Sequence, residues 1–444
     1  MKLVILLLIV ALTYANIRVD LSRFEKEKIP SEYLRLISDT ISIEDPKIKE
    51  IEDLLEFSTG LGNVRVQLTN FRNLQYYGPL YLGSKRKRLN FVYDTGSSWL
   101  WFPGTSCTGC PTDYEYDPSK SEFYTDFNKS KELFYGKGYV KGKVIQDNVA
   151  MMGIDSESVP VKMLEVFEAK DLAGTQADGI LGLSPKSSDS DLLVNKLAEM
   201  NVIDKREFTV YIAPQEDTSF IDFGEYKGDL TNITWAKLDK DTNYWSVPFN
   251  YISYMNEPLS LTSTSAVLDT GTSILGFPST DLAQIIIGIK GENKLYYFEE
   301  IGLYGVLCEN LSEFYDLEFN IRGHITRISS DDYMIQVGKY CVFFLFDLGS
   351  KFPFALLGDS YLKGNLIVHD MDKQRVGLFP QKLYHKPNLY KESNKMLLFI
   401  ILISAVAFIA LVVIIVVAYK LLKKSAEEEE DSSSESELAE RMIQ

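Results

Sequence analysis

The chain has 444 residues, of which 45% are hydrophobic and 24% charged, and its formal net charge at pH 7 is −16. An acidic excess of this size argues against nucleic-acid binding, because contact with the phosphate backbone depends on a concentrated positive field. The length is sufficient for two domains or for one large domain of two lobes.

The N-terminal residues are typical of a cleaved secretory signal peptide over residues 1–15. A single Lys2 precedes an apolar stretch at residues 3–12, and small side chains follow as far as Ala15. An uncleaved anchor is disfavoured because ten apolar residues are too few to span a bilayer comfortably. We therefore expect the chain that follows to enter the lumen of the secretory pathway.

Residues 16–65 differ from the rest of the chain, being rich in Glu, Lys, Ile and Ser, with helical spacing around residues 30–36 and 48–55. Two interpretations are open at this level, a linker and a propeptide that offers cations to an acidic cleft. The propeptide is the interpretation that we adopt. Its candidate cations are Arg18, Arg23, Lys26, Lys28 and Arg35.

The middle of the chain, from residue 64 to 380, consists of short apolar or aromatic runs broken by Gly, Asn, Asp and Pro. The whole chain contains 26 Tyr and 25 Phe, residue types that β-rich domains prefer. The clearest helix candidate is residues 189–201, which Ser190 or Asp191 could cap. The pattern predicts a mostly β fold.

A segment of twelve residues occurs twice. Residues 92–103 and 267–278 are identical at eight of twelve positions, and each copy has an Asp-Thr-Gly turn after an apolar run. The acidic residues of the two turns are Asp94 and Asp269. The repeat predicts two related halves that contribute one carboxylate each. Two carboxylates in one site cannot both ionise easily, and such a pair can provide acid and base chemistry together.

The duplication extends beyond these turns. Gly182 ends a Gly-Ile-Leu-Gly run 88 residues after Asp94, and Gly358 ends an Ala-Leu-Leu-Gly run 89 residues after Asp269. One Asp-Thr-Gly alone would be weak evidence, since short motifs need context. Two copies with the same flanks and the same downstream partner are strong evidence for a duplicated lobe.

The four cysteines are best explained as two disulfides, which fits an oxidising compartment. We pair Cys107 with Cys110 and Cys308 with Cys341. No metal site is expected, because the chain has three histidines and none of them is near Cys107. Three sequons for N-glycosylation, which would mark surface positions, begin at Asn128, Asn232 and Asn310.

Residues 396–419 are predicted to cross a membrane as one helix. The segment has 24 residues, no charge and only Ser404 as a distinctly polar side chain, so it is long enough to span the hydrocarbon core. A lysine-rich stretch at residues 420–424 follows directly and favours a cytosolic C-terminus. We predict a single-pass type I protein with a lumenal stalk at residues 382–395.

Residues 420–444 form the predicted cytosolic tail, which holds four basic and eight acidic residues. Serines at positions 432–434 and 436 lie within the acidic run. A solvated, disordered tail is favoured over a phosphorylated sorting signal.

With these residues the chain resembles the pepsin family of aspartic proteases, over roughly residues 70–380. The markers are the two Asp-Thr-Gly motifs, the two glycine-ended runs, and the closing Val-His-Asp-Met-Asp-Lys-Gln-Arg-Val-Gly-Leu-Phe-Pro at residues 368–380. The resemblance implies a bilobal pepsin-like fold with an active-site cleft between two related β lobes, which we place at residues 66–208 and 209–381. It also implies protein or peptide substrates, no cofactor and a monomeric catalytic unit.

The resemblance implies that Asp94 and Asp269 are the catalytic dyad, one ionised as general base on a water between them and the other protonated. It implies three kinds of support around them. Small residues let the backbone turn tightly beneath each carboxylate, one pair of hydroxyls cross-braces the two loops, and another pair binds the outer carboxylate oxygens. These are, in order, Gly96 and Gly271, Thr95 and Thr270, and Ser97 and Thr272.

A Tyr-Gly-Lys-Gly run begins at Tyr135, 41 residues after Asp94, where the family carries a β-hairpin flap. The resemblance implies that Tyr135 closes over the substrate, with Gly136 and Lys137 beside it, and that Trp101 supports the tyrosine hydroxyl. The glycines would suit a mobile flap. Taken alone, the run would indicate only an ordinary hairpin turn.

The chain departs from the family pattern in several places, none of which touches the dyad. Lys137 occupies a flap position that is usually small or hydroxylic, where a cation would favour acidic substrate residues. Trp99 replaces the usual Asn, and a disulfide common in the second lobe is missing. A basic run at residues 83–88 is interpreted as a solvated turn rather than a processing site. Asp178 and Asp359 match the family pattern and are interpreted as structural.

We therefore predict a membrane-anchored aspartic endopeptidase, made as a zymogen and active at acid pH, with its catalytic domain lumenal or extracellular. A broad digestive protease and a processor of one membrane substrate both remain open, as does the choice between an endolysosomal, a secretory and a cell-surface membrane. The alternative from another class is a non-catalytic membrane receptor that keeps the fold. The intact Asp-Thr-Gly turns and Tyr135 oppose it.

Overall fold

The structure is a computed structural model that describes residues 62–71, 75–112, 114–136, 138–151, 157–172, 175–214, 219–298 and 302–379. The predicted signal peptide, nearly all of the predicted propeptide, the stalk, the predicted membrane segment, the tail and Lys137 lie outside these residues. Within the described part of the chain, no helix is long and apolar enough to cross a membrane. Strands dominate and helices are few, which confirms the predicted mostly β class.

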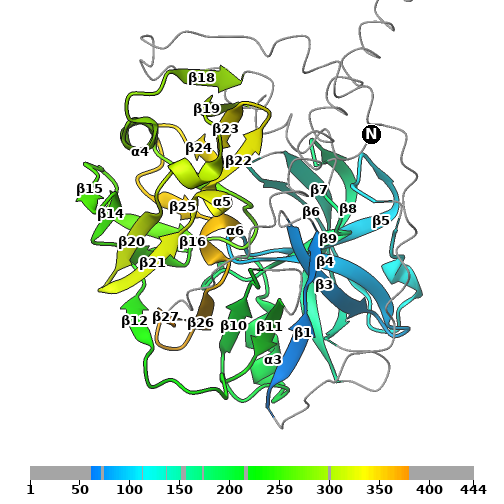
Figure 1. The fold of residues 1–444 in the computed structure, drawn as a ribbon. Coiled ribbons are helices and arrows are strands. Elements are labelled where there is room, and N and C mark those ends of the chain that lie inside the picture. The colour runs from blue at the N-terminus through cyan, green and yellow to red at the C-terminus, as the bar shows by residue number, and fades with distance from the viewer. Residues whose placement is uncertain are drawn as a thin grey trace, which may run out of the picture.

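The first half of the described chain is built on an eight-stranded sheet, blue to teal in Figure 1. Its strands are β2 (Thr69–Phe71), β3 (Gln75–Leu82), β4 (Lys87–Asp94), β5 (Leu100–Thr108), β6 (Thr125–Phe134), β7 (Tyr139–Ala150), β8 (Ser158–Lys170) and β9 (Gly179–Gly182). The order is β2-β3-β4-β9-β5-β8-β7-β6, so that β6 forms one edge. Along β8, buried Val159, Val161 and Met163 alternate with less buried residues, which is the period of a strand packed on one face.

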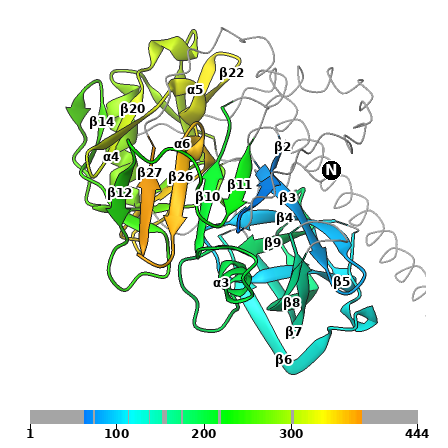
Figure 2. The same ribbon diagram turned by 90° about the horizontal axis from the view of Figure 1, so that it is seen from below.

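A six-stranded sheet joins the two halves of the molecule. Its strands are β1 (Val64–Gln67), β10 (Glu207–Tyr211), β11 (Phe220–Phe223), β12 (Thr234–Lys237), β26 (Leu366–Asp370) and β27 (Arg375–Leu378), in the order β1-β11-β10-β26-β27-β12. Figure 2 shows most of these strands side by side between the two halves. The guanidinium of Arg65 binds both carboxylate oxygens of Asp222, at 2.7 and 2.6 Å. The predicted end of the propeptide, at residue 65, thus falls inside β1.

The second half, green to yellow in Figure 1, contains three smaller sheets. The five-stranded sheet is formed by β13 (Ser246–Pro248), β16 (Ser265–Leu268), β25 (Ala355–Leu357), β17 (Leu275–Phe277) and β24 (Leu345–Asp347), in that order. One four-stranded sheet contains β15 (Glu257–Pro258), β14 (Tyr251–Tyr254), β20 (Leu317–Ile321) and β21 (His324–Ile328). The other contains β18 (Leu295–Phe298), β19 (Leu303–Leu307), β23 (Tyr340–Phe343) and β22 (Met334–Val337).

The helices of the described residues are short, and they are α3 (Leu193–Glu199), α4 (Ser279–Lys290), α5 (Ser330–Tyr333), α6 (Asp359–Leu362) and the 3-10 turns η1 (Pro118–Lys120) and η2 (Leu311–Glu313). The helix predicted at residues 189–201 begins later and ends earlier than expected. Neither predicted cap is used. The Ser190 hydroxyl donates to the Ser98 carbonyl at 2.6 Å, and Asp191 accepts from the Lys162 N–H at 2.9 Å. Tertiary hydrogen bonds therefore take both side chains away from the helix end.

The two copies of the repeat have the same local topology. β4 ends at Asp94 and pairs in parallel with β9, while β16 ends one residue before Asp269 and pairs in parallel with β25. A Cβ atom at Gly182 would lie 2.5 Å from the backbone of the loop after Asp94, and one at Gly358 would lie 2.2 Å from the loop after Asp269. Only glycine allows backbones to approach so closely. The matched glycines thus hold each acidic loop against a neighbouring strand.

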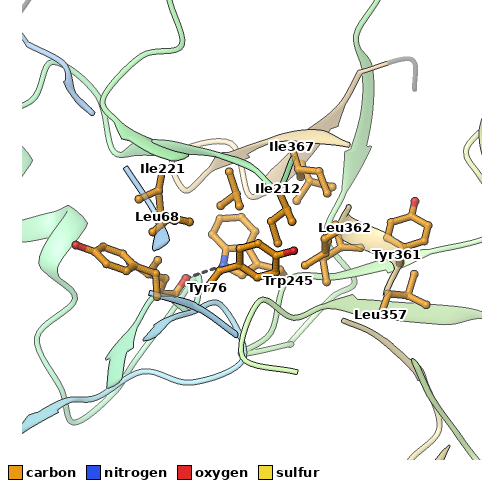
Figure 3. Close-up of a cluster of buried hydrophobic side chains, with 14 of the residues drawn as sticks. Leu68, Tyr76, Ile212, Ile221, Trp245, Leu357, Tyr361, Leu362 and Ile367 are labelled. Atoms are coloured by element: carbon orange, nitrogen blue, oxygen red, sulfur yellow. Dashed lines mark hydrogen bonds between the residues drawn. The ribbon is translucent and has the colours of Figure 1, made fainter. Parts of the chain in front are cut away.

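One apolar cluster draws side chains from both halves, and part of it is shown in Figure 3. Leu68 and Tyr76 come from the first half, and Trp245 and Tyr361 from the second. Trp245 is fully buried and donates its indole N–H to the Leu183 carbonyl at 2.7 Å. The two halves therefore share a core rather than meeting at a wet interface.

His369, on β26, is buried among aromatic rings. Its ring is stacked on Phe208 at 4.4 Å and lies edge-on to Trp245 at 4.7 Å. Neither ring nitrogen has a hydrogen-bond partner of good geometry among the described residues. Burial lowers the pKa of His369 to about 3, and nearby backbone groups offset this only in part. Because an unfolded histidine titrates near 6.5, the unfolded chain binds more protons below that pH, and stability falls as pH drops from 6.5 towards 3.

We predict that His369→Phe stabilises the protein selectively in acid. Phenylalanine can occupy the same stack but cannot be protonated, so at pH 4.5 the free energy of unfolding should rise by about 2 kcal/mol. At pH 7.5 the gain should be much smaller. Urea unfolding of both proteins at the two pH values checks this, and an equal gain at both would show that protonation is not the cause.

Candidate active site

The two predicted catalytic carboxylates lie at equivalent points of the two halves. Asp94 is the last residue of β4, and Asp269 directly follows β16. Both are buried, with 6% and 8% of their surface exposed. Each carboxylate therefore stands at the end of a central strand, where the chain turns away into a short loop.

Each carboxylate is held by its own loop in the same way. The Gly96 N–H donates to Oδ1 of Asp94 at 2.8 Å, and the Ser97 hydroxyl donates to Oδ2 at 2.5 Å. In the second copy, the Gly271 N–H donates to Oδ1 of Asp269 at 2.9 Å and the Thr272 hydroxyl to Oδ2 at 2.7 Å. Ser97 and Thr272 thus lie where the resemblance implied, each against the outer oxygen of its carboxylate.

The two loops are braced against each other by Thr95 and Thr270. Each backbone N–H donates to the hydroxyl oxygen of the other threonine, both at 3.0 Å. Each hydroxyl in turn donates across to the opposite strand, Thr95 to the Leu268 carbonyl at 2.8 Å and Thr270 to the Tyr93 carbonyl at 2.5 Å. All of these groups are buried, so the brace has no competition from water.

The reason for the two glycines differs from the one that we expected. A Cβ atom at Gly96 would lie 2.5 Å from Oδ1 of Asp269, and one at Gly271 would lie 2.3 Å from Oδ1 of Asp94. The carboxylate that excludes a side chain is thus that of the opposite half, not the one directly above each turn. Both Oδ1 atoms are directed at the other half, and the two carboxylates are brought together.

The shared site changes the acidity of its members. Burial, together with the charge of Asp269, raises the pKa of Asp94 well above its ordinary value. The hydrogen bonds from Ser97 and Gly96 favour the ionised form and oppose this only in part. Because the two carboxyls interact strongly, they titrate as a pair. The pair retains one proton over a range of pH in which isolated carboxyls would be fully ionised.

Asp359 is a third buried carboxyl beside the dyad, in a place where the sequence suggested only a structural role. It opens α6, and its backbone N–H donates to the Thr272 carbonyl at 2.8 Å. Burial holds the pKa of Asp359 well above its ordinary value; the charge of Lys363 opposes this and that of Asp269 adds to it. Asp359 therefore keeps its proton to a higher pH than an ordinary carboxyl. The sequence feature that could have indicated this position is that Asp359 directly follows the matched Gly358.

Asp178, by contrast, has the bonding of a structural residue. One carboxylate oxygen accepts from the Asn90 N–H at 2.8 Å and the other from the Thr112 hydroxyl at 2.6 Å. It is buried and ties β4 to two loops of the first half.

The predicted flap is the hairpin between β6 and β7. The Tyr135 N–H donates to the Gly138 carbonyl at 2.7 Å and closes the turn. The ring of Trp101 lies 6.5 Å from that of Tyr135. The Trp101 side chain lowers the pKa of the Tyr135 hydroxyl, which means that it favours the ionised form. The geometry falls short of a hydrogen bond, and the indole nitrogen has no partner among the described residues. Burial and the charge of Asp94 raise the pKa of Tyr135, so its hydroxyl keeps a proton to donate.

The two described glycines of the flap have different surroundings. A Cβ atom at Gly138 would lie 2.0 Å from the carbonyl oxygen of Lys170, so this glycine allows the hairpin to press against the end of β8. A Cβ atom at Gly136 would meet nothing within 4 Å. Close packing, rather than mobility, thus explains the glycine at position 138. Lys137, between the two glycines, lies outside the described residues.

A cavity of about 280 Å³ opens between the dyad loop and the flap. The flap wall is formed by the end of β6, and the opposite wall by the loop before α3. Its lining residues are Gly96, Ser97, Ser98, Trp99, Leu133, Phe134, Tyr135, Ser184, Lys186, Ser187, Ser188, Asp189, Asn243 and Tyr244. The cavity begins at the loop that holds Asp94, so a ligand group lying in it would be next to the two carboxylates.

Both predicted disulfides form, Cys107 with Cys110 and Cys308 with Cys341. The sequon residues Asn128 and Asn232 are exposed, and Asn310 is half-buried at the start of η2. The basic run forms the turn between β3 and β4 and the first residues of β4, in keeping with a solvated turn. Of the predicted site residues that the structure describes, Gly96, Ser97 and Tyr135 line the cavity, and Thr95, Thr270, Gly271 and Thr272 hold or brace the carboxylate loops, whereas Trp101 and Gly136 do neither.

Comparison with known proteins gives a consistent result. A family model described as eukaryotic aspartyl protease matches residues 75–381. The chain is 32% identical to vacuolar protease A of Arthroderma otae, over 71% of this chain and 81% of that protein. It is 27% identical to pepsin A of Gallus gallus, over 70% and 86%, and 28% identical to plasmepsin IV of Plasmodium falciparum, over 72% of each.

The chain belongs to the eukaryotic aspartyl proteases. It is an aspartic-type endopeptidase, and the alternative of a non-catalytic receptor finds no support in these relatives. Protein or peptide substrates follow from the family.

The collision distances predict which glycine of this aspartyl protease is indispensable. Gly96→Ala would place a methyl group against Asp269 and separate the carboxylates, so kcat/KM should fall by at least about 100-fold. Gly288→Ala, in helix α4 and outside the cavity lining, adds the same methyl group where it meets only the end of the Leu259 side chain, at 3.0 Å, and should change kcat/KM by less than about threefold. Peptide hydrolysis by both variants, with circular dichroism to verify folding, checks the contrast. Equal losses would show that the methyl group acts through something other than the dyad.

Proposed function

We propose that Asp94 and Asp269 form the catalytic dyad of this protease and hydrolyse peptide bonds through a water molecule activated between them. The observation that carries the proposal is the approach of two buried carboxylates from matched loops. Each outer oxygen accepts a hydroxyl hydrogen bond, and each inner oxygen is directed at the other half. The inner oxygens are therefore the pair that remains for water and substrate.

In this mechanism the dyad begins with one proton. The ionised carboxylate takes a proton from the water as its oxygen attacks the scissile carbonyl carbon, and the protonated carboxyl donates a hydrogen bond to the carbonyl oxygen. A tetrahedral intermediate forms without any bond to the protein. As the C–N bond breaks, a carboxyl gives its proton to the departing nitrogen, and the dyad returns to the state with one proton.

The surrounding residues act by keeping this geometry. Ser97 and Thr272 hold the outer oxygens, and the threonine brace holds the two loops, so that little reorganisation is needed as charge develops. Tyr135 lies above the cavity with its hydroxyl protonated, and we assign it to covering the bound peptide and excluding water.

The shared proton also sets the pH range of activity. Activity requires one proton on the pair, so it is lost at low pH when both carboxyls are protonated and at high pH when both are ionised. The raised pKa of Asp94 extends the active state upwards from the range of ordinary carboxyls. The profile of kcat/KM against pH should therefore be bell-shaped, with two limbs that belong to the dyad as a whole.

We predict that Asp94→Asn and Asp269→Asn each reduce kcat by at least about 1,000-fold, since either change removes the acid–base pair. Asp241→Asn is the matched control, because Asp241 is exposed and has a φ of 57°, which asparagine adopts readily. The full chain is acidified and assayed on casein from pH 3 to pH 8, with and without a pepstatin-like inhibitor. Substantial inhibitor-sensitive activity in either dyad variant would exclude the mechanism.

We further propose that the enzyme is a zymogen held in a membrane as a type I protein, with residues 16–65 as propeptide and residues 396–419 as anchor. The support lies in the signal-like N-terminus, the uncharged segment of 24 residues and the lysines after it. Activity that appears only after acidification, in membranes that keep the protein through alkaline extraction, is the expected result. Full activity at neutral pH from the start would count against the zymogen, and release into the supernatant against the anchor.

A further inference from the structure

The cavity beside the dyad has two walls of different origin. Leu133, Phe134 and Tyr135, at the end of the flap strand β6, form one wall. The loop that runs from Ser184 to Asp189 forms the other. The separation of these walls sets the size of the side chain that fits next to the scissile bond.

The second wall is attached firmly to the dyad loop. The Ser184 N–H donates to the Ser97 carbonyl at 2.9 Å, and the Ser190 hydroxyl donates to the Ser98 carbonyl at 2.6 Å. A further bond at 2.6 Å joins the hydroxyls of Ser190 and Ser187. Since Ser97 also binds Asp94, this wall keeps a fixed position relative to the dyad.

The flap wall has fewer constraints of its own. β6 is the edge strand of the eight-stranded sheet and is hydrogen-bonded to β7 alone. Most of its residues are exposed, and its register with β7 shifts between Asp126 and Lys129. An edge hairpin of this kind depends on side-chain contacts to keep a fixed distance from the rest of the lobe.

Lys131 and Asp189 provide such a contact between β6 and the loop that forms the second wall. The ammonium of Lys131, on β6, lies 2.5 Å from Oδ2 of Asp189 on the opposite wall. Trp99 contacts both members of this pair, since its indole N–H donates to Oδ1 of Asp189 at 3.3 Å and the Lys131 ammonium lies 5.2 Å from the centre of its ring. Trp99 is itself buried and follows directly after Ser97 and Ser98.

The surroundings of Asp189 favour its ionised form, so the ion pair with Lys131 persists to a lower pH than the ordinary acidity of an aspartate would allow. Burial tends to raise the pKa of Asp189, but the hydrogen bond and charge of Lys131, with smaller effects of Trp99 and Ser187, outweigh it and hold the pKa below its ordinary value. Among the described residues, Lys162 on β8 lies 5.9 Å from the centre of the Trp99 ring, with its backbone N–H bound to the Asp191 carboxylate, and Lys186 lies on the loop.

We propose that Lys131 and Asp189, together with Trp99, which contacts both, are positioning residues that tether the flap hairpin to the dyad loop and fix the width of the cavity for the substrate side chain. The proposal rests on the proposed function, because the tether holds the flap over the carboxylates that the proposed function makes catalytic. It also gives a role to Trp99, which departs from the family pattern.

The expected size of the effect follows from exposure. The side chains of Lys131 and Asp189 are 30% and 51% exposed, so the pair belongs with partly solvated ion pairs. Loss of such a pair changes a local equilibrium by about two- to fivefold. The tether should therefore alter flap opening and KM rather than the chemical step.

Hydrogen–deuterium exchange on the full chain at pH 4.5 tests the tether without any need for activity. Lys131→Met, Asp189→Asn and the double variant are compared with wild type over residues 125–145. Each single variant should exchange about two- to fivefold faster there, and the double variant no faster than either, because one contact is lost in all three. Lys129→Met is the matched control, as Lys129 lies exposed on the same strand with no ion pair among the described residues.

Hydrolysis of peptides with large and small side chains beside the scissile bond gives the second readout. We expect KM for the large side chain to rise about two- to fivefold in the single variants, with kcat and its pH profile unchanged. Unchanged exchange in the hairpin, or additive effects in the double variant, would overturn the tether. An inactive wild type with accelerated exchange in the variants would instead overturn the proposed function and leave the tether standing.

Discussion

Two threonine hydroxyls, buried where the halves of the molecule meet, hold the active site together. Thr95 and Thr270 exchange hydrogen bonds with each other's backbone and reach across to the strand of the opposite half. An unpaired polar group at such a depth costs about 1–3 kcal/mol, so the brace tolerates little displacement. The loops that carry the two carboxylates are fixed relative to one another by this arrangement before any substrate binds.

The close approach of the carboxylates is the chemical consequence. The brace places Asp94 against Gly271 and Asp269 against Gly96, at distances that no other residue at the glycine positions would allow. Two buried carboxyls so close together do not both ionise easily, and burial likewise raises the pKa of Asp359 nearby. A site able to give and take one proton thus follows from packing at the junction of two similar halves.

Much of this arrangement could be predicted from the repeat. Duplicated Asp-Thr-Gly turns and glycine-ended runs at the same spacing predicted two related halves with one carboxylate each. The short apolar runs and the many aromatic residues predicted the β class, and the hydroxyl partners of the carboxylates followed only from the family resemblance. Contacts between segments that are far apart in the sequence could not be predicted from it. Ser190 and Asp191 have good capping chemistry, but their side chains bind β8 and the dyad loop, so the helix begins later. Likewise, Trp99 differed visibly from the family pattern, but only the fold brings Lys131 and Asp189 to it.

The most direct test of the account is a mutant cycle on the brace, with Thr95→Val, Thr270→Val and the double variant measured for urea unfolding and for kcat/KM. Each single variant should lose about 2 kcal/mol of stability, because buried backbone groups lose their partners, and the double variant should lose less than the sum. In every variant kcat/KM should fall, while Thr125→Val on the exposed flap strand leaves both quantities nearly unchanged. A brace variant that loses stability but keeps the full kcat/KM of wild type would contradict the claim that the brace positions the carboxylates.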